Sequence, residues 1–378
     1  MKIAVSTRLF IPEKRDGIGT FTKEVFQYLS NKYQEHEFHF VFDRAPSPTI
    51  KFSKNVVVHV VGVPTRHYSL TYLWYNIFVA RLLKKIEPDF FISPDGVTPI
   101  FSNVPCIPVL HDLAFEVRPQ DLPFFVRTFV HKTLAASAKR AIRVATVSAN
   151  SKKDIEHLYK VPSHKIDIIY SGISNHFSPI SVEEQNAVRA KFTHNENYFL
   201  FVGTVLPRKN LLNLLKAFDL FKMESKSMMK LLVVGNVWLW GKDLQNVYEN
   251  MQYKNDVVLT GRLEDKEVAD LYASAFAVTY VSHYEGFGLP VLETFNSGVP
   301  LITASTSCLT EIAGDAALFA HPEAPKEIAQ RMQQLISEVD LRQKLIEKGN
   351  ARKNKFTWQD TAELLWQSLL TAKNNLNK

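Results

Sequence analysis

Residues 276–300 read FAVTYVSHYEGFGLPVLETFNSGVP. The apolar run at 276–282 is typical of a buried strand, and Pro290 suits the first turn of a helix that the closing Gly-Val-Pro ends. Between the two, Gly286 and Gly288 let the backbone approach a ligand closely. N–H groups at a helix start, together with the helix dipole, attract a phosphate. The stretch therefore predicts strand, glycine loop and helix, with an anion site at the turn.

One carboxylate stands on each side of this anion site, at Glu285 and Glu293. A carboxylate repels phosphate, so we expect both side chains to accept hydrogen bonds from neutral hydroxyl groups of a sugar or a ribose. The implied ligand is a nucleotide-sugar. The alternative is that the glycines only make a tight turn and the glutamates are solvated, and the short motif alone does not separate the two.

Length and composition suit a globular protein of two domains. The chain has 378 residues, of which 46% are hydrophobic and 22% charged. Cys106 and Cys308 are its only cysteines, so the sequence supports neither a disulfide framework nor a zinc site and favours a reducing, cytoplasmic setting. The first residues do not resemble an export signal, and no apolar run has the length of a membrane span. We therefore expect a protein that is neither exported nor membrane-spanning.

The positive charge is concentrated in the first half. Residues 1–175 carry 23 Lys and Arg against 15 Asp and Glu, whereas residues 176–378 carry 22 against 23. Such a field suits nucleic acid, an anionic membrane surface or a phosphorylated substrate. The charges are scattered and match no nucleic-acid-binding motif, so we expect no nucleic acid partner.

A peripheral membrane contact is a separate hypothesis, motivated by LTYLWYNIFVARLLKKI at 70–86. Its aromatic and aliphatic residues precede Arg81, Lys84 and Lys85, a pattern that suits an anionic lipid interface. A helix packed on its own sheet, with its basic end in solvent, explains the same residues and is the preferred interpretation.

Apolar runs of strand length recur along both halves, mostly separated by helix-length segments. In the first half they are KIAVST (2–7), FHFVFD (38–43), VVVHVV (56–61), DFFISP (89–94), IPVLHD (107–112), RVATVS (143–148) and IDIIYS (166–171). In the second half they are YFLFVGT (198–204), KLLVVG (230–235), VVLTG (257–261), FAVTYVS (276–282), PLITAS (300–305) and AALFA (316–320). Continuous apolar runs are typical of parallel strands buried on both faces. We predict an α/β protein with two Rossmann-like, doubly wound domains at 1–177 and 198–355, a linker region at 178–197 and a C-terminal helix at 356–378.

Polar residues and glycines follow several of these runs, where open parallel sheets bind ligands. They are His111, Asp112, Ser148, Gly203, Thr204, Gly235, Gly261, Arg262 and Glu285. The segment FVGTVLPRKN (201–210) adds Arg208 and Lys209, two cations that neutralise a diphosphate without a metal ion. Each residue also has a structural alternative, namely a turn glycine, a packing histidine or an exposed basic turn.

With these motifs the chain resembles the retaining glycosyltransferases of family 4, the group 1 glycosyl transferases. They have the glycosyltransferase B (GT-B) fold, in which two Rossmann-like domains face each other across a cleft. The resemblance covers nearly the whole chain, and motif order and spacing also match. Its motifs are GIGTF (17–21), HDLAF (111–115), TVSANSKKDI (146–155), YSGI (170–173), FVGTVLPRKN (201–210), VVGNVWLWG (233–241), TGRLEDKEVADLY (260–272), EGFGLPVLE (285–293) and SGVP (297–300).

The resemblance implies a role for each motif. Glu285 contacts hydroxyls of the transferred sugar, Glu293 holds the ribose diol, and Arg262 lies at the nucleobase pocket. The implied catalytic residues are Glu285, His111, Arg208 and Lys209. The implied donor-binding residues are Gly203, Arg208, Lys209, Gly235, Arg262, Leu263, Glu285, Gly286, Phe287, Gly288, Leu289 and Glu293. Gly17 and Gly19 lie on the acceptor side.

Three positions depart from the family pattern. Thr204 stands where many relatives carry an Arg, so either Arg208 replaces that residue or the grip on the diphosphate is looser. Asp16 precedes Gly17 where a Gly-Gly pair is common. Thr310-Glu311 replaces a frequent Pro-Glu, which leaves the role of Glu311 open.

The resemblance implies a hexosyltransferase of cell-surface polysaccharide or lipopolysaccharide synthesis, working with retention and with neither a metal nor a cofactor. Mannose from GDP-mannose is the preferred donor, because the VGT-x-x-PRKN loop is similar to that of transferases that build O-antigen and capsule. A UDP-hexose donor is the alternative. A glycan or lipid-linked acceptor should bind the first half, with the reaction in the cleft and the last helix returning to the first domain. The expected location is cytoplasmic, with peripheral contact at the inner face of the membrane as a hypothesis.

Two other protein classes fit part of the pattern. A non-catalytic two-domain sugar-binding protein also closes an α/β cleft on a ligand, but such proteins usually carry an export signal and have no use for diphosphate cations. An NAD-dependent oxidoreductase needs a G-x-G-x-x-G turn directly after its first strand, and GIGTF at 17–21 lacks that spacing.

Overall fold

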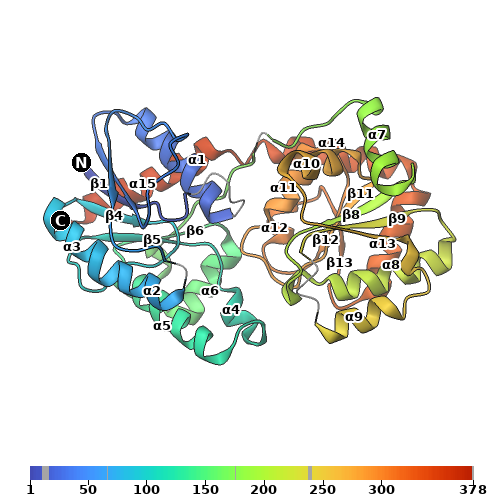
Figure 1. Ribbon diagram of the computed structural model, residues 1–378, viewed down its shortest axis with the longest axis horizontal. Helices are drawn as coiled ribbons and strands as arrows, with labels where there is room; N and C mark the ends of the chain where they lie inside the picture. Colours follow the sequence, from blue (N-terminus) through green and yellow to red (C-terminus); the bar gives the residue numbers. More distant parts are fainter. Residues whose placement is uncertain (11–16, 66, 175, 237–240, 377–378) are drawn as a thin grey trace. The chain divides into compact units, whose positions relative to one another are not determined.

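The computed structural model describes residues 1–10, 17–65, 67–174, 176–236 and 241–376. The chain divides into two compact units, Met1–Gly172 with Phe356–Lys378, and Ile173–Lys355. Each unit is a sheet of parallel strands covered by helices (Figure 1). The prediction of two doubly wound α/β domains is confirmed.

The first unit has a seven-stranded sheet in the order β3-β2-β1-β4-β5-β6-β7. Its strands are β1 (Lys2–Ser6), β2 (Glu37–Phe42), β3 (Val56–Val60), β4 (Phe90–Ser93), β5 (Cys106–Leu110), β6 (Val144–Thr146) and β7 (Ile166–Ile168). Each strand overlaps one of the apolar runs of the sequence, and its last residue comes one to three residues before the last residue of that run. Because β1 pairs with both β2 and β4, the strand order reverses between β1 and β4.

Helices cover both faces of this sheet, which is why its strands are apolar throughout. The helices are α1 (Gly17–Lys32), α2 (Tyr68–Leu73), the π-helix η1 (Trp74–Val79), α3 (Ala80–Ile86), α4 (Ala114–Val117), η2 (Pro119–Asp121), α5 (Phe124–Arg140), α6 (Ala149–Tyr159), η3 (Ser163–Lys165) and α15 (Trp358–Leu376). Ile3 and Val5 pack with α1 and α15, whereas Ala4, between them on β1, packs with η1 and α3.

The last helix, α15, packs on α1 within the first unit. The ring of Trp366 stacks on Tyr33 with centroids 4.0 Å apart. The hydroxyl of Thr361 donates a hydrogen bond of 2.6 Å to the carbonyl of the second residue after β7. The side-chain oxygen of Thr357 accepts a hydrogen bond of 3.0 Å from the backbone N–H of Asp360 and so caps the start of the helix. Residues far apart in the sequence therefore complete one core.

The segment 70–86 packs on the other face of the same sheet. Trp74 and Val79 are fully buried, so much of the aromatic and aliphatic surface that a lipid interface requires lies inside the protein, although Leu73 is 46% exposed. This is the packing that the preferred interpretation expects, a helix on its own sheet with a solvated basic end. The exposed basic residues are Arg81, Lys84 and Lys85. No helix in the described part of the chain is long and apolar enough to span a membrane.

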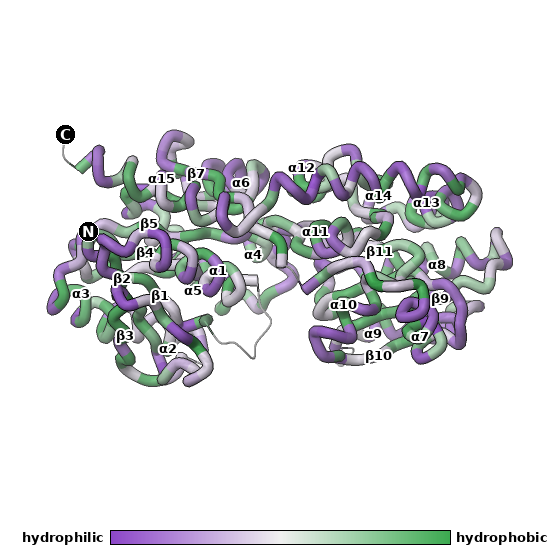
Figure 2. The backbone as a smooth tube through the Cα atoms, turned by 90° about the horizontal axis from the view of Figure 1, so that it is seen from above, coloured by the Kyte–Doolittle hydropathy of each residue, from purple (hydrophilic) through white to green (hydrophobic). Residues whose placement is uncertain are grey.

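The second unit has a six-stranded sheet in the order β10-β9-β8-β11-β12-β13. Its strands are β8 (Tyr198–Val202), β9 (Lys230–Val234), β10 (Val257–Gly261), β11 (Ala277–Tyr280), β12 (Leu301–Ala304) and β13 (Leu318–Ala320). Its helices are α7 (Val182–Thr193), η4 (Pro207–Lys209), α8 (Leu211–Ser225), α9 (Lys242–Glu249), η6 (Lys254–Asp256), α10 (Asp265–Ser274), α11 (Leu289–Asn296), α12 (Leu309–Ala313), α13 (Pro325–Ser337) and α14 (Val339–Lys353). Hydrophobic and hydrophilic residues alternate along α13, which shares one apolar core with α8 and the sheet (Figure 2).

The segment 178–197, expected as a linker region, contains helix α7 and lies within the second unit. Ser181 and Glu184 form a capping box at its start, each side chain accepting a hydrogen bond from the backbone N–H of the other. Thr193 is the only residue of this helix that is buried. An exposed helix has the polar composition of a linker, and composition alone does not distinguish them.

Candidate active site

The strand order of the second unit brings two loops together. β8 pairs with β11, so η4 after β8 lies beside the loop between β11 and α11. The backbone N–H of His283 donates to the carbonyl of Arg208 at 2.8 Å. The side chain of Asn210 donates to the carbonyls of Val281 at 2.9 Å and Pro322 at 2.7 Å. These bonds hold η4 against the glycine loop.

Glu285 lies at the centre of this contact and is only 6% exposed. Arg208 Nη1 is 2.7 Å from its Oε2, and Lys209 Nζ is 2.7 Å from its Oε1. Burial raises the pKa of Glu285, but the charges of Lys209 and Arg208 lower it by more, so the pKa lies below its ordinary value. The carboxylate is therefore ionised at neutral pH and shared by two cations.

Tyr280, the last residue of β11, completes the group. Lys209 Nζ is 2.8 Å from its hydroxyl oxygen. Burial, followed by the charge of Glu285, raises the pKa of Tyr280 well above its ordinary value, so the phenol is neutral. We call Arg208, Lys209, Glu285 and Tyr280 the cation cluster. Two cations against one carboxylate leave it with one net positive charge, which suits an anion.

The glycine loop leads into α11 as the sequence predicts. Gly288 has a φ of +91°, and a Cβ there would lie 2.8 Å from the side chain of Leu309. Glycine is therefore strongly favoured where the chain turns into the helix. The backbone N–H of Glu285 donates to Ser307 Oγ at 3.2 Å, which orients the start of the loop. Leu289 and Pro290 form the first turn of α11, so the helix N-terminus lies where the anion site was expected.

Glu293 lies on α11 and is partly exposed. The hydroxyl of Tyr272, a fully buried residue of α10, donates to its Oε2 at 2.9 Å. This bond fixes one carboxylate oxygen and shows that Glu293 accepts from a hydroxyl group, as a ribose diol would require.

Glycines line the carboxyl ends of three neighbouring strands, β8, β9 and β10. A Cβ on Gly235 would lie 2.0 Å from the carbonyl oxygen of Gly203, so no side chain fits there. The N–H of Gly203 donates to Val234, and that of Gly235 donates to Gly261 at 2.9 Å. The backbones therefore form a floor without side chains. Two predicted residues directly follow Gly261 in the chain, namely Arg262, which is exposed, and Leu263, which is half-buried.

The remaining predicted residues lie in the first unit. Gly17 is the first residue of α1, and Gly19 is buried in its first turn. His111 follows β5, and its Nε2 is 2.8 Å from the carbonyl oxygen of Pro94. A carbonyl only accepts, so Nε2 carries a proton in this bond. The ring of Phe21 packs edge-on against His111 with centroids 5.0 Å apart.

Sequence reasoning missed five residues of the second unit that support the predicted ones. They are Tyr280, Tyr272, Asn210, Ser307 and Cys308. Tyr280 is the last residue of β11, so the expectation that ligands bind at the carboxyl ends of parallel strands would have selected it. Tyr272 and Cys308, whose thiol donates to the carbonyl of Glu285 at 3.1 Å, lie on other elements and carry no local signal.

The positions that depart from the family pattern differ in their surroundings. Thr204 is exposed after β8. Glu311 lies on α12, and its backbone carbonyl accepts a hydrogen bond from Arg352. Asp16 and part of the motif at 233–241, namely 237–240, lie outside the described residues.

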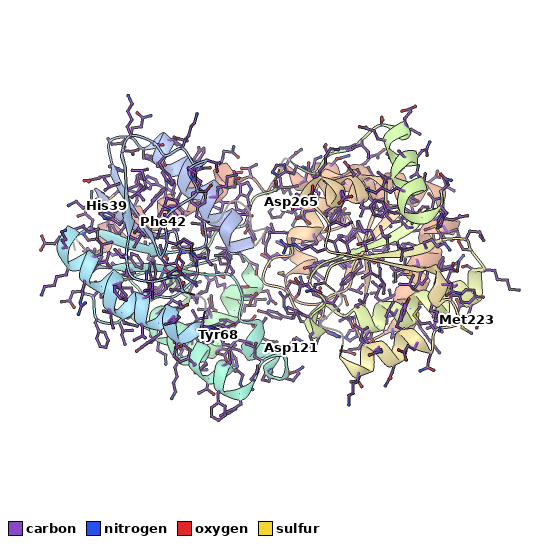
Figure 3. The ribbon with its side chains drawn as sticks, viewed as in Figure 1. His39, Phe42, Tyr68, Asp121, Met223 and Asp265 are labelled. Atoms are coloured by element: carbon purple, nitrogen blue, oxygen red, sulfur yellow. The ribbon has the colours of Figure 1, made fainter. Side chains whose placement is uncertain are left out.

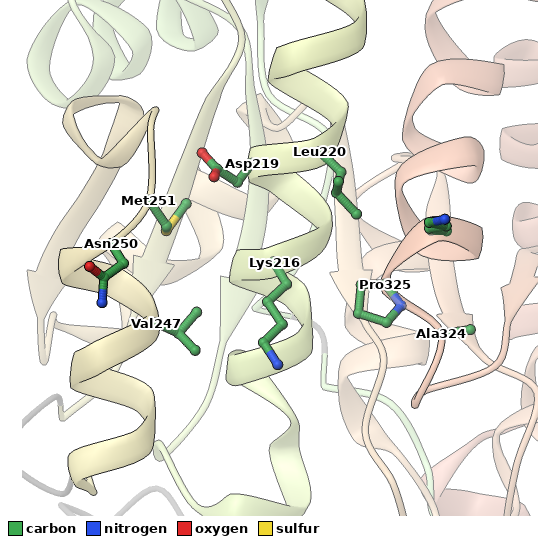
Figure 4. Close-up of a pocket in the computed structure, with 9 residues that line it drawn as sticks. Lys216, Asp219, Leu220, Val247, Asn250, Met251, Ala324 and Pro325 are labelled. Carbon is green, nitrogen blue, oxygen red and sulfur yellow. The ribbon is translucent and has the colours of Figure 1, made fainter.

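A cavity of 660 Å³ lies between α8, α9 and the start of α13 (Figure 4). Leu220, Val247 and Met251 make most of its wall apolar, and none of the predicted site residues lines it. Across the described ranges, no three His, Cys, Asp or Glu side chains are grouped as metal ligands would be.

Comparison with known proteins identifies both halves. Residues 15–176 match the family model described as Glycosyltransferase Family 4, and residues 182–352 match that of Glycosyl transferases group 1. The O-antigen chain mannosyltransferase B of Escherichia coli is 30% identical over 67% of this chain and 67% of its own. The O-antigen chain mannosyltransferase RfbU of Salmonella typhimurium is 30% identical over 56% of each.

A solved structure shares the fold over the full length. Alr3699/HepE of Anabaena, crystallised with UDP and glucose, superposes with a TM-score of 0.74 at 16% identity and covers 98% of this chain and 100% of its own. Because both family models describe glycosyltransferases, they exclude the alternatives of a sugar-binding protein and an oxidoreductase. The chain belongs to the group 1 glycosyl transferases of glycosyltransferase family 4 and is a glycosyltransferase with the GT-B fold.

Proposed function

We propose that this enzyme transfers mannose from GDP-mannose, with retention, to a glycan or lipid-linked acceptor in cell-surface polysaccharide synthesis. The two O-antigen mannosyltransferases support the sugar and the setting. The observation that carries the proposal is the contact of Arg208 and Lys209 with Glu285 beside the start of α11. That arrangement sets one net positive charge beside the N-terminus of α11, where a diphosphate would bind.

Charge development explains how the cation cluster acts. In the proposed reaction the bond between the anomeric carbon and the phosphate oxygen breaks, and a bond from that carbon to an acceptor oxygen forms. The acceptor's proton leaves to the released diphosphate or to solvent. Arg208 and Lys209 stabilise the diphosphate as its charge grows, and Glu285 orients the sugar through its hydroxyls. We propose that these two cations replace a metal ion.

Nucleotide release tests the proposal directly. With the full chain, GDP release from GDP-mannose should exceed UDP release from UDP-hexoses, and GDP should raise the melting temperature more than UDP. Greater stabilisation and turnover with UDP would overturn the mannose assignment. It would favour the UDP-hexose alternative, which the UDP complex of Alr3699/HepE keeps open. A product of inverted anomeric configuration would overturn retention. NMR identifies the configuration from the carbon–proton coupling at the anomeric carbon.

Metal independence has its own test. After exhaustive chelation the enzyme should keep its full rate of GDP release. A loss of turnover that Mg²⁺ or Mn²⁺ restores would contradict the assignment of the diphosphate charge to Arg208 and Lys209 alone.

A peripheral membrane contact is the last part of the proposal. Because Trp74, Val79 and other large apolar residues of 70–86 are in the core, attraction would depend mainly on the exposed Arg81, Lys84 and Lys85. The chain should then sediment with anionic vesicles more than with neutral ones, and added salt should abolish the difference. Equal, negligible binding to both would exclude the contact.

A further inference from the structure

A second ligand-sized cavity lies inside the first unit. It has a volume of 350 Å³ and is bordered by Arg8 after β1 and Asp95 after β4. These two strands are neighbours, and the strand order reverses between them. In open α/β sheets, the carboxyl ends of strands at such a reversal form the preferred ligand crevice. The cavity is large enough for one sugar ring, at the lower end of the range of about 300–1,000 Å³ for ligand pockets.

The polar wall of this cavity is a buried and fully organised ion pair. Arg8 Nε pairs with Asp95 Oδ2, and the two side chains are only 15% and 5% exposed. Tyr75 and Ser93 both donate to the other oxygen of Asp95, at 2.5 Å and 2.7 Å. Arg8 also donates to Thr65 at 3.2 Å. Such a network holds its donors and acceptors rigidly.

The net charge of this wall is zero. Burial lowers the pKa of Arg8, but Asp95 and Tyr75 raise it by more, so the guanidinium stays charged. Its charge is balanced by the carboxylate of Asp95, and among the residues that the structure describes the cavity lining adds no other Lys, Arg, Asp or Glu. A phosphate or carboxylate would therefore meet no excess positive charge and would face Asp95. A hydrocarbon chain would displace water from this polar wall and offer no hydrogen bonds in return. A neutral ligand with hydroxyl groups satisfies both constraints.

Aromatic and aliphatic residues also line the cavity. Tyr72 of α2 and Phe129 of α5 pack edge to face, with centroids 5.6 Å apart. Val97 and Leu134 add further apolar surface to the lining. Tyr68, labelled in Figure 3, is the first residue of α2. It also lines the cavity and is 56% exposed. The polar groups can exchange hydrogen bonds with the hydroxyls of a pyranose ring, and the aromatic rings can pack on its C–H face.

We propose that this cavity binds a neutral pyranose ring of the acceptor, with its hydroxyls on Arg8 and Asp95 and its C–H face on Tyr72 and Phe129. The inference rests on the proposed function for the identity of the acceptor, and it assigns a site apart from Gly17 and Gly19. Phosphorylated sugars and lipid chains are excluded from it by charge and polarity. Asp95 and Phe129 thereby determine acceptor specificity.

The test uses one substitution at two positions of α5. Phe129 lines the cavity, whereas Phe125 is 85% exposed and does not. With GDP-mannose and a panel of neutral methyl hexosides as acceptors, Phe129→Ala should raise the acceptor KM about tenfold, the size of one lost aromatic contact. Donor KM should stay unchanged. Phe125→Ala should leave both constants unchanged. Equal effects of the two variants on acceptor KM would overturn the assignment.

A binding arm without donor separates this inference from the proposed function. Saturation-transfer NMR of the full chain should detect a methyl hexoside, and Thr133→Phe, which fills the cavity, should abolish that signal while leaving GDP-induced thermal stabilisation intact. Thr133 lines the cavity and is partly exposed, so the larger side chain has room to fold. If no nucleotide-sugar is turned over but Thr133→Phe removes hexoside binding, the proposed function fails and the cavity assignment stands. If hexose phosphates bind and neutral hexosides do not, the assignment fails.

Discussion

Replacing Glu285 by Gln tests the charge logic of the cation cluster. The substitution keeps the size of the side chain and removes the charge that Arg208 and Lys209 share at 2.7 Å. The cluster then carries two uncompensated positive charges in a largely buried site. We expect opposite effects on two measured quantities, with the free energy of unfolding falling and the affinity for free GDP rising.

The burial of the three side chains sets the size of both effects. Glu285, Lys209 and Arg208 are 7%, 13% and 23% exposed. Removing one partner of a buried pair costs about 3–5 kcal/mol, and the partial exposure of Arg208 favours about 3 kcal/mol. For a unit of this size that is a fall in melting temperature of roughly 6–12 °C. The added positive charge should strengthen GDP binding by about 1 kcal/mol, or about fivefold in Kd. Turnover should fall by about 10²-fold, because the sugar loses its orienting carboxylate.

Calorimetric titration with GDP, thermal unfolding with and without GDP, and GDP release from GDP-mannose measure the three effects. The matched control is Glu323→Gln, because Glu323 is 62% exposed and pairs with His283 of the same loop at 3.1 Å. We expect the control to change stability by less than about 0.5 kcal/mol and to leave GDP affinity unchanged. Weaker GDP binding by Glu285→Gln, with turnover preserved, would refute the proposed roles.

The same carboxylate predicts a dependence of stability on pH. The pKa of Glu285 lies below its ordinary value of 4.5, so its contribution to folding is complete above that pH and is lost as pH falls through the lower, folded-state pKa. The stability difference between the wild type and Glu285→Gln should therefore shrink in acid. Urea unfolding from pH 7 to pH 3 measures it, and a difference that stays constant below pH 4 would argue against the pairing.

Three further substitutions separate binding, turnover and packing. Lys209→Ala should lower kcat by about 10²-fold with a smaller effect on donor affinity, because its charge matters most as the leaving diphosphate forms; steady-state kinetics with GDP-mannose measures this, and an effect on KM alone would contradict it. Glu293→Ala should weaken the binding of free GDP, and Tyr272→Phe should weaken it less, because the second substitution removes only the hydroxyl that orients the carboxylate. Titration calorimetry measures both affinities, and unaltered GDP binding by Glu293→Ala would contradict the assignment. Gly235→Ala should destabilise the fold by about 3 kcal/mol or more, since its Cβ would lie 2.0 Å from a carbonyl oxygen, whereas Gly241→Ala, whose Cβ would meet no atom of the described residues within 4 Å, should be nearly neutral. Equal urea midpoints of the two variants would exclude the clash.

Much of the fold could be read from local pattern. The apolar runs at 198–204 and 276–282 contain β8 and β11, because a parallel strand covered on both faces needs apolar residues throughout. Gly288 marks the turn into α11 because its φ of +91° strongly favours glycine. Both constraints act within a few residues. The polar stretch at 178–197 shows the limit of this reasoning, since its composition fits a linker and an exposed helix equally.

The partners of each side chain depend on the tertiary structure. Arg208 and Glu285 are 77 residues apart, and they meet because β11 pairs with β8 although β9 and β10 come between them in the chain. Arg8 and Asp95 meet in the same way across β1 and β4, and no local pattern announced their cavity. Residue type and periodicity determine which segments become strands and which face of each is buried. The order in which strands pair is set by the packing of the whole sheet, and that order decides which charges lie side by side.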